Sequence, residues 1–362
     1  MPNQRAIASE LGLAQATVSR ALQGSPLVNP ETRKLVREAA ERLGYRPNPV
    51  VSTLMEHIRT GREVSSQGCI AILAPASNKE EWLWHEVFQH HYEGFQTQAA
   101  LRGYRTECFH LEAPGVSAAQ IDRVFHARGI RGVILSSVGN PEIIRQMDWS
   151  RYATAKIGDS SPYPEVDSAS SSHFQNLAKA FIETAGRGYE RIGLCLPRGP
   201  KGQKANSQWL ASYLVQQYEL PQAQQVPPFL GAPRSVPLKE FRKWYDRWRP
   251  DALLCLWGEE WEWITAMGIS TDDEMAFVCV NRPTRSIFAG VEENNIIVGA
   301  MTCELVVNQL VHNEGGLPRH PRQIFVEGTW VDGKTLPAHK PKVRAARRTP
   351  KTATKKSAAS EP

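Results

Sequence analysis

The segment LAQATVSRAL, residues 13–22, holds four polar side chains that can hydrogen-bond to nucleic acid: Gln15, Thr17, Ser19 and Arg20. Gln pairs with adenine, Arg with guanine or a phosphate, and Ser or Thr with either a base or a phosphate. Because apolar residues are interleaved with them, a helix over about residues 14–22 would place the polar side chains opposite its apolar side. The pattern predicts either an ordinary solvated helix face or a face that contacts bases.

Three short helices would position these side chains. Asn3 can cap a first helix that ends near Leu11, after which Gly12 allows a turn. Asn29 and Pro30 begin a third helix that runs to about residue 44. The apolar and small residues follow the order that a helix-turn-helix requires. They are Ile7, Ala8, Leu11, Gly12, Leu13, Val18 and Ala21.

The charges are concentrated at the two ends of the chain. Residues 1–62 hold nine Lys/Arg and five Asp/Glu, a net charge of +4, and residues 337–362 hold eight and one, a net charge of +7. The whole chain carries +6, so the residues between the ends carry −5. A mildly acidic body with two basic ends indicates that the ends contact a polyanion.

Composition excludes several classes of protein. With 41% hydrophobic and 22% charged residues, the chain has an ordinary globular composition and no apolar run long enough for a membrane helix. The first residues, MPNQRAIASELG, lack the apolar core of a secretory signal, so a cytoplasmic protein is expected. The six cysteines are widely separated and form no C-x-x-C pair, which favours reduced thiols. Neither a metal site nor a cofactor is expected.

From residue 68 onward, short apolar runs alternate with amphipathic segments of about a dozen residues. The predicted strands are 69–73, 104–111, 132–137, 154–158, 191–197, 251–257 and 275–280. The predicted helices are 88–101, 117–128, 173–187, 207–218, 239–248 and 293–312. This alternation predicts an α/β fold in which parallel sheets are covered by helices on both faces, and its length suits two lobes.

Residues 4–54, above all the segments ATVSRAL, NPETR and LGYRPN, resemble the DNA-binding headpiece of the lactose-repressor (LacI/GalR) family of bacterial regulators. The alternating region resembles the family's effector-binding core in topology. The resemblance implies an all-α helix-turn-helix headpiece followed by a two-lobed core like that of periplasmic binding proteins. The expected domains are the headpiece (1–47), a hinge helix and linker (48–65), the effector-binding and dimerisation core (66–336) and a disordered basic tail (337–362).

The resemblance also implies which residues contact DNA. Gln15 and Ala16 hold the two main base-reading positions, and Thr17, Ser19 and Arg20 support them with base or phosphate contacts. The expected contacts to the DNA backbone are Asn3, Gln4, Asn29 and Thr32. The segment PNPVVSTLM matches the family's hinge helix, which adds Asn48 and makes Leu54 the residue that wedges a base step apart in the minor groove. A plain linker helix packed on the core is the alternative.

The expected effector site lies between the two core lobes and is less well defined. Where sugar-binding members carry Arg, Asn and Asp, this sequence has Trp209, Trp257 and Asn281, and a further Asp position falls on Asp167 or Ser170. The other expected effector residues are Ser77, Ser136 and Trp82, and the alternative for Trp82 is that it merely anchors its loop. Two indoles in place of hydrogen-bonding groups indicate an aromatic wall for a sugar ring or a planar ligand. The alternative is that the tryptophans fill the cleft and that no effector binds.

The expected function is a sequence-specific transcriptional regulator, with a repressor favoured, whose affinity for operator DNA is set by a small molecule such as a sugar or related metabolite. The alternative is a DNA-associated architectural protein that binds through the headpiece and the basic tail without an effector. No catalytic motif is recognisable, and the acidic cluster GEEWEW suits a helix start better than an acid pair, so no enzyme is expected. The tail has no leucine heptads, so a homodimer is expected.

Overall fold

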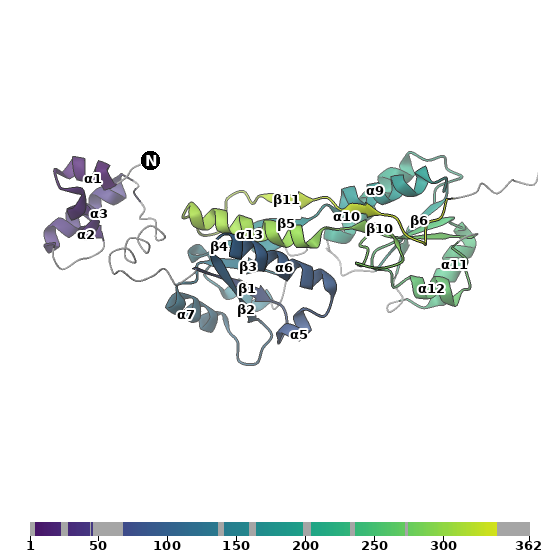
Figure 1. Cartoon of the computed structure of the whole chain (residues 1–362), viewed down its shortest axis with the longest axis horizontal. Helices are drawn as coiled ribbons and strands as arrows, with labels where there is room; N and C mark the ends of the chain where they lie inside the picture. Colours follow the sequence, from purple (N-terminus) through teal and green to yellow (C-terminus); the bar gives the residue numbers. More distant parts are fainter. Residues whose placement is uncertain are drawn as a thin grey trace, which may run out of the picture. The chain divides into compact units, whose positions relative to one another are not determined.

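The structure is a computed structural model of the 362-residue chain (Figure 1). It describes residues 4–22, 28–43, 45, 68–136, 141–158, 164–197, 204–231, 236–271 and 274–338. The chain divides into two units, the first comprising Met1–Ala169 and Ile296–Ile324 and the second Ser170–Asn295 and Phe325–Pro362. Among the described residues, no helix is both long enough and apolar enough to span a lipid bilayer.

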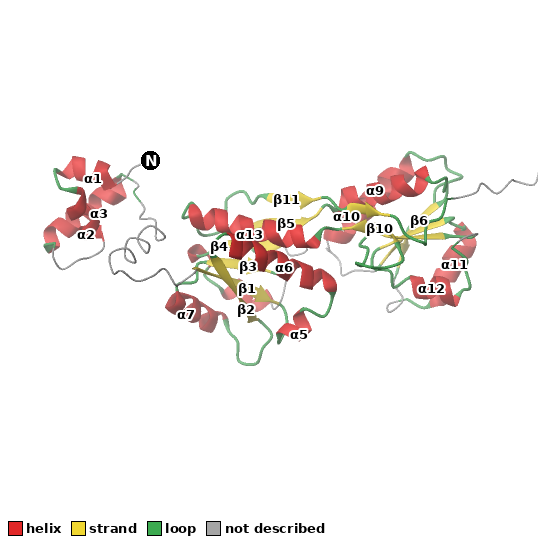
Figure 2. Ribbon diagram, viewed as in Figure 1, coloured by secondary structure: helices red, strands yellow, loops and turns green. Residues whose placement is uncertain are grey.

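The N-terminal part of the first unit is a bundle of three helices, α1 (Gln4–Leu11), α2 (Gln15–Leu22) and α3 (Pro30–Arg42) (Figure 2). All three contribute to one small core, in which Ile7, Val18 and Val36 are completely buried. Gly12 joins α1 to α2 with a φ of +63°, a backbone conformation that side chains with a Cβ rarely adopt. The helix-turn-helix predicted from the sequence is therefore present, with the predicted glycine at the turn.

The rest of the first unit is built on a six-stranded sheet with the strand order β11-β5-β4-β3-β1-β2. Its strands are β1 (Gly68–Ala74), β2 (Tyr104–His110), β3 (Gly132–Leu135), β4 (Ala153–Ile157), β5 (Asp167–Ser171) and β11 (Gln323–Val326). Strands β1 to β5 pair in parallel. The helices are α5 (Lys79–Trp82), α6 (Glu86–Leu101), α7 (Ala118–Arg128), α8 (Pro141–Gln146), the 3-10 turn η1 (Trp149–Arg151) and α13 (Asn295–Val311).

The second unit has a six-stranded sheet with the order β12-β10-β9-β8-β6-β7. Its strands are β6 (Ile192–Leu196), β7 (Phe229–Leu230), β8 (Ala252–Cys255), β9 (Ala276–Cys279), β10 (Ala289–Glu292) and β12 (Thr329–Val331). Its helices are α9 (His173–Gly186), α10 (Lys204–Tyr218), α11 (Leu238–Trp248) and α12 (Trp261–Ala266). Among the described strands of this sheet, β12 runs antiparallel to its neighbour β10, and β6 to β10 are parallel.

Apolar side chains cover both faces of this second sheet. Leu254 on β8 points into one core with Phe181 of α9 and Tyr213 of α10. The preceding residue, Leu253, points into the other core with Phe241 of α11. Successive strand residues face opposite sides of a sheet, so a continuous apolar run is what a strand with helices on both faces needs. This explains why apolar runs located the strands.

The predicted fold class is confirmed, and all seven predicted strands are present as β1, β2, β3, β4, β6, β8 and β9. The sequence did not predict β5, β7, β10, β11 and β12. The predicted hinge helix and linker, residues 48–65, lie outside the described residues, as does the predicted tail beyond Ala338.

Candidate functional site

Helix α2 presents one side to the bundle core and the other side outward. Val18 and Ala21 are completely buried, whereas Gln15, Ala16 and Arg20 are exposed. Thr17 and Ser19 are half-buried at the border between the two sides. The helix is fixed by its packing, and its exposed polar residues form the surface that the sequence assigned to base contacts.

Helix α3 begins with a side-chain cap that the sequence anticipated. The Asn29 Oδ1 accepts a hydrogen bond from the backbone N–H of Thr32 at 2.7 Å, and Pro30 occupies the first turn. The Asn29 oxygen is therefore committed to the helix, so a contact from this residue to a DNA phosphate would come from its amide nitrogen. At the other end of α3, Arg42 pairs with Glu10 of α1 and ties the two helices together.

Four of the predicted DNA contacts cannot be located. Asn3, Asn48 and Leu54 lie outside the described residues, and the side chain of Gln4, at the start of α1, does too. They remain predictions.

The second unit brings several of the predicted effector residues to one edge of its sheet. Trp257 and Asn281 follow β8 and β9, whose carboxyl ends meet at the same edge because the strands are parallel. This is the edge at which open α/β sheets bind ligands. Trp257 is partly exposed, whereas Asn281 is buried. The predicted Trp209, on α10, is buried in the adjoining core.

Two residues that sequence reasoning missed join this group. His173, the first residue of α9, lies with its ring centroid 4.2 Å from that of Trp209. Its Nδ1 is 3.0 Å from Oε1 of Glu293, which follows β10 at the same edge. A carboxylate at Nδ1 fixes the imidazole orientation and favours the tautomer with the proton on Nδ1. In that tautomer Nε2 is a hydrogen-bond acceptor. His173 and Glu293 are far apart in the sequence, so the sequence alone does not indicate that they pair.

The first unit carries its own predicted effector residues. Ser77 is exposed in the loop after β1, and its backbone N–H donates to Glu81 at 2.9 Å. Ser136 follows β3 and is buried, and its Oγ has no hydrogen-bond partner within the described part of the chain. Both therefore lie just beyond the carboxyl end of a parallel strand.

The surroundings of Trp82 favour the alternative expected for it, an anchor of its loop, over a contact with ligand. The indole is buried and packs edge-on against Tyr92 of α6, with ring centroids 5.3 Å apart. It anchors the α5 loop, while the neighbouring Trp84 is the exposed aromatic residue there.

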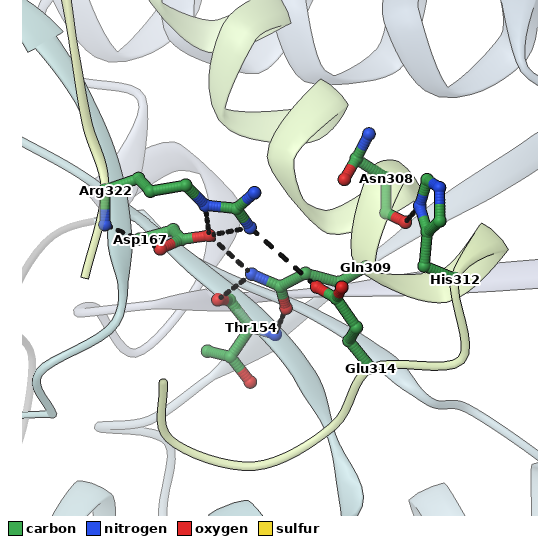
Figure 3. Close-up of polar contacts among 7 residues, drawn as sticks. All are labelled: Thr154, Asp167, Asn308, Gln309, His312, Glu314 and Arg322. Carbon is green, nitrogen blue, oxygen red and sulfur yellow. Dashed lines mark hydrogen bonds and ion pairs between the residues drawn. The ribbon is translucent and has the colours of Figure 1, made fainter. Parts of the chain in front are cut away.

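Asp167 was also assigned to ligand binding, and its surroundings argue against that assignment (Figure 3). It is completely buried at the start of β5, the end of a parallel strand opposite the ligand-binding edge. Its carboxylate accepts hydrogen bonds from the backbone N–H, Nε and Nη2 of Arg322, at 2.8, 3.0 and 2.6 Å, and from Nε2 of Gln309 at 3.1 Å. Four donors occupy the carboxylate, so Asp167 is a structural residue. Ser170, the alternative position, is buried further along β5.

The acidic cluster after β8 contains one unusual carboxyl. Glu260 is buried, and one of its oxygens lacks a hydrogen-bond partner among the described residues. Burial raises the pKa of Glu260 from 4.5 to about 7, and the neighbouring Glu259 adds to the effect. The Cys255 thiol hydrogen-bonds to it and works in the opposite direction.

The headpiece segment matches a known family. Residues 5–48 fit the family described as "Bacterial regulatory proteins, lacI family". The HTH-type transcriptional regulator AglR of Rhizobium meliloti (strain 1021) is 29% identical over 198 residues, which cover 53% of this chain and 51% of AglR. Catabolite control protein A of Priestia megaterium is 54% identical over 48 residues, 13% of this chain and 14% of that protein. The chain thus matches about half the length of one of these relatives and about a seventh of the other.

Solved structures share the fold. The transcriptional regulator CelR in complex with cellobiose superimposes with a TM-score of 0.56 at 18% identity, covering 92% of this chain and 100% of that one. The Lac repressor dimer bound to operator and the anti-inducer ONPF gives 0.54 at 16% identity, covering 92% and 99%.

Proposed function

We infer, starting from a chain whose N-terminal domain belongs to the lacI family of bacterial regulatory proteins, that the protein is a sequence-specific DNA-binding transcriptional regulator. The observation that carries this inference is α2, which is packed on one side by Val18 and Ala21 and presents Gln15, Ala16 and Arg20 on the other. A helix held in this way enters the major groove with its N-terminal residues against base edges.

The exposed side chains suggest how bases would be distinguished. Gln15 can form two hydrogen bonds to adenine, and Arg20 can bind guanine or a phosphate. Ala16 offers only a methyl contact, so discrimination at the base it meets is weak. The headpiece of one chain reads one half-site, and a homodimer reads a pseudo-palindromic operator.

A small molecule bound by the core sets the affinity of the headpiece for operator DNA. Cellobiose in the CelR structure and ONPF in the Lac repressor structure support a carbohydrate or a related metabolite. In the second unit, His173 and Asn281 supply polar groups, and Trp257 supplies an aromatic face that suits a sugar ring. The proposed regulator acts in the cytoplasm and performs no catalysis. Repression of transcription is its favoured mode of action.

The test is selection of genomic DNA fragments by the full-length protein at moderate salt, followed by sequencing. Arg20→Ala is run in parallel, with Arg37→Ala as the matched control, because Arg37 is an exposed cation on α3 outside the predicted recognition surface. The expected result is a shared pseudo-palindrome for the wild-type protein and Arg37→Ala, and its loss for Arg20→Ala.

The opposite outcome is equally informative. If all three proteins recover fragments without a common sequence, the basic ends bind DNA generically, and the architectural alternative replaces the regulator.

A further inference from the structure

The six strands of the sheet in the first unit begin at the same edge. Strands β1 to β5 are parallel. Strand β11 runs the same way beside β5, because the N–H groups of Ser168 and Ser172 donate to the carbonyls of Arg322 and Val326. We call this the amino edge, and the segments that lead into or begin its strands are 102–105, 128–131, 148–152, 164–167 and 312–322.

The amino edge is rich in arginine. Its five segments hold seven Arg, no Lys and four Asp/Glu, a net charge of +3. Two further carboxylates, Glu107 and Glu304, pair with its arginines and leave a net charge of +1. The opposite edge of the same sheet is acidic, because the segments after β1 and β2, residues 75–85 and 111–117, hold one Lys and three Glu. The two edges therefore differ in the sign of their charge.

Two arginines of the amino edge are free to bind an anion outside the chain. Arg131 donates from Nη1 to the neutral side chain of Asn313 at 3.2 Å. Arg319 is exposed and has no acidic partner among the residues that the structure describes. The loop that carries Arg319 lies against the sheet, because the Gly316 N–H donates to the Tyr152 carbonyl at 3.0 Å. An exposed guanidinium on a fixed loop suits a contact with phosphate.

Arg322 fixes the far end of this loop. Its Nη2 lies 2.6 Å from the buried Asp167 carboxylate and 3.9 Å from the Glu314 carboxylate (Figure 3). The loop is thus tied to the sheet on both sides of Arg319 and His320, whose side chains are exposed. Because the loop is already ordered, a ligand bound there does not have to order it.

The amino edge is also where the chain enters the first unit's sheet after the headpiece, at Gly68, the first residue of β1. DNA held by the headpiece is therefore connected through the chain to the arginine-rich edge and not to the acidic one. Phosphates are attracted to the first and repelled by the second.

We propose that Arg131 and Arg319 of the amino edge bind phosphates of the DNA that the headpiece holds. The proposal rests on the proposed function, since it takes DNA as the ligand. It adds a second contact surface, within the core, which strengthens binding without reading bases.

The test is the salt dependence of operator binding by the full-length protein, measured by fluorescence anisotropy between about 50 and 200 mM salt. Each phosphate contact adds about 0.9 to the slope of log K against log salt concentration. Arg131→Ala and Arg319→Ala should each lower the slope by about 0.9 for every chain bound. Each should also weaken binding to the operator and to a scrambled duplex by the same factor, severalfold.

Two further variants control for charge and for folding. Lys79→Ala removes one positive charge at the opposite edge, where Lys79 is exposed on α5, and should leave the slope unchanged. Arg319→Lys keeps the charge, so it should retain the wild-type slope.

An unchanged slope in both arginine-to-alanine variants would overturn the proposal, even if their affinity falls, because the side chains would then serve only the fold. An equal decrease in Lys79→Ala would also overturn it, since the effect would be one of net charge. Failure of the proposed function shows separately, as the lack of a shared sequence in the DNA selection. The same slopes on a random duplex would still decide whether the amino edge contacts DNA.

Discussion

Gln309 on α13 hydrogen-bonds both backbone groups of Thr154 on β4. Its Oε1 accepts from the Thr154 N–H at 2.7 Å, and its Nε2 donates to the Thr154 carbonyl at 3.1 Å. The ladder between β4 and β5 begins at Ala155 and Asp167, so the Thr154 N–H lies just beyond its end. The Gln309 amide takes the place of a strand, and its second N–H reaches Asp167 (Figure 3).

We expect Gln309→Leu to lower the free energy of unfolding by about 2–4 kcal/mol, because it leaves the Thr154 N–H and part of the buried Asp167 carboxylate without their side-chain partner. Urea denaturation measures the change. Asn308→Ala is the control, since Asn308 is exposed on the same helix and accepts from His312 only through its backbone carbonyl. A Gln309→Leu protein as stable as the control would contradict the role assigned to the amide.

Gly94 and Gly299 allow α6 and α13 to pack with their backbones in contact. A Cβ on Gly299 would lie 2.3 Å from the His91 carbonyl oxygen, and one on Gly94 would lie 2.2 Å from that of Ile296. We expect Gly299→Ala to destabilise the protein by more than about 2 kcal/mol, because two helix backbones must separate. Thermal melting is the measurement. Gly186→Ala, at an open position at the end of α9, should be neutral or slightly stabilising, and equal losses in both variants would refute the close packing.

Glu260 predicts a pH-dependent stability. Because its pKa is about 7 in the folded protein and 4.5 ordinarily, the folded state holds the proton more tightly. The stabilisation of the folded state by this proton is complete below pH 4.5, decreases as the pH rises toward 7 and is then lost. The free energy of unfolding changes by about 3 kcal/mol over this range. Glu260→Gln should remove this slope in denaturation experiments between pH 5 and pH 8. Parallel pH profiles for the variant and the wild type would show that the carboxyl titrates normally.

Asn29 separates helix capping from DNA binding. Asn29→Asp retains an oxygen that caps α3, so the headpiece should melt as the wild type does. It also replaces the amide nitrogen with negative charge, so the affinity for the selected operator should decrease severalfold in a fluorescence anisotropy titration. Asn29→Ala should instead lower headpiece stability by about 1 kcal/mol. Wild-type affinity in Asn29→Asp would exclude a phosphate contact from this residue.

His173 should control ligand affinity if the second unit binds a sugar. We expect a change in tryptophan fluorescence when a panel of mono- and disaccharides is added, because Trp209 adjoins the imidazole ring. His173→Ala should weaken that binding at least about tenfold through the lost hydrogen bond. His312→Ala is the control, because His312 is an exposed histidine just after the end of α13. Unchanged affinity in His173→Ala would remove the residue from the site, and a panel without any response would count against a sugar.

The sequence predicted most of the strands that carry a continuous apolar run, and two of the strands it missed consist largely of small or polar residues. Strand β5 reads DSASS, and β10 reads AGVE. Their small side chains are buried by close neighbours, so no local hydrophobic pattern marks them. The exposed side of α2 was predictable because Val18 and Ala21 fix the inner side of this eight-residue helix.

The candidate ligand residues were harder to predict because their surroundings are set by distant parts of the chain. Asp167 resembled a binding residue until Arg322, 155 positions later, was seen to occupy its carboxylate. Likewise Glu293 is 120 positions from His173. A single sequence indicates which residue types end a strand, but it does not reveal which of them already have a partner.

The chain passes from the first unit to the second, returns to the first and ends in the second, so a truncated gene does not encode one complete unit. A fragment that stops at Ala169 lacks α13 and Arg322, and with them the partners of Gly94, Thr154 and Asp167. No single cut therefore releases an intact copy of either unit. Deletions from the carboxyl end that reach residue 324 should damage both units together, so the core must be expressed whole.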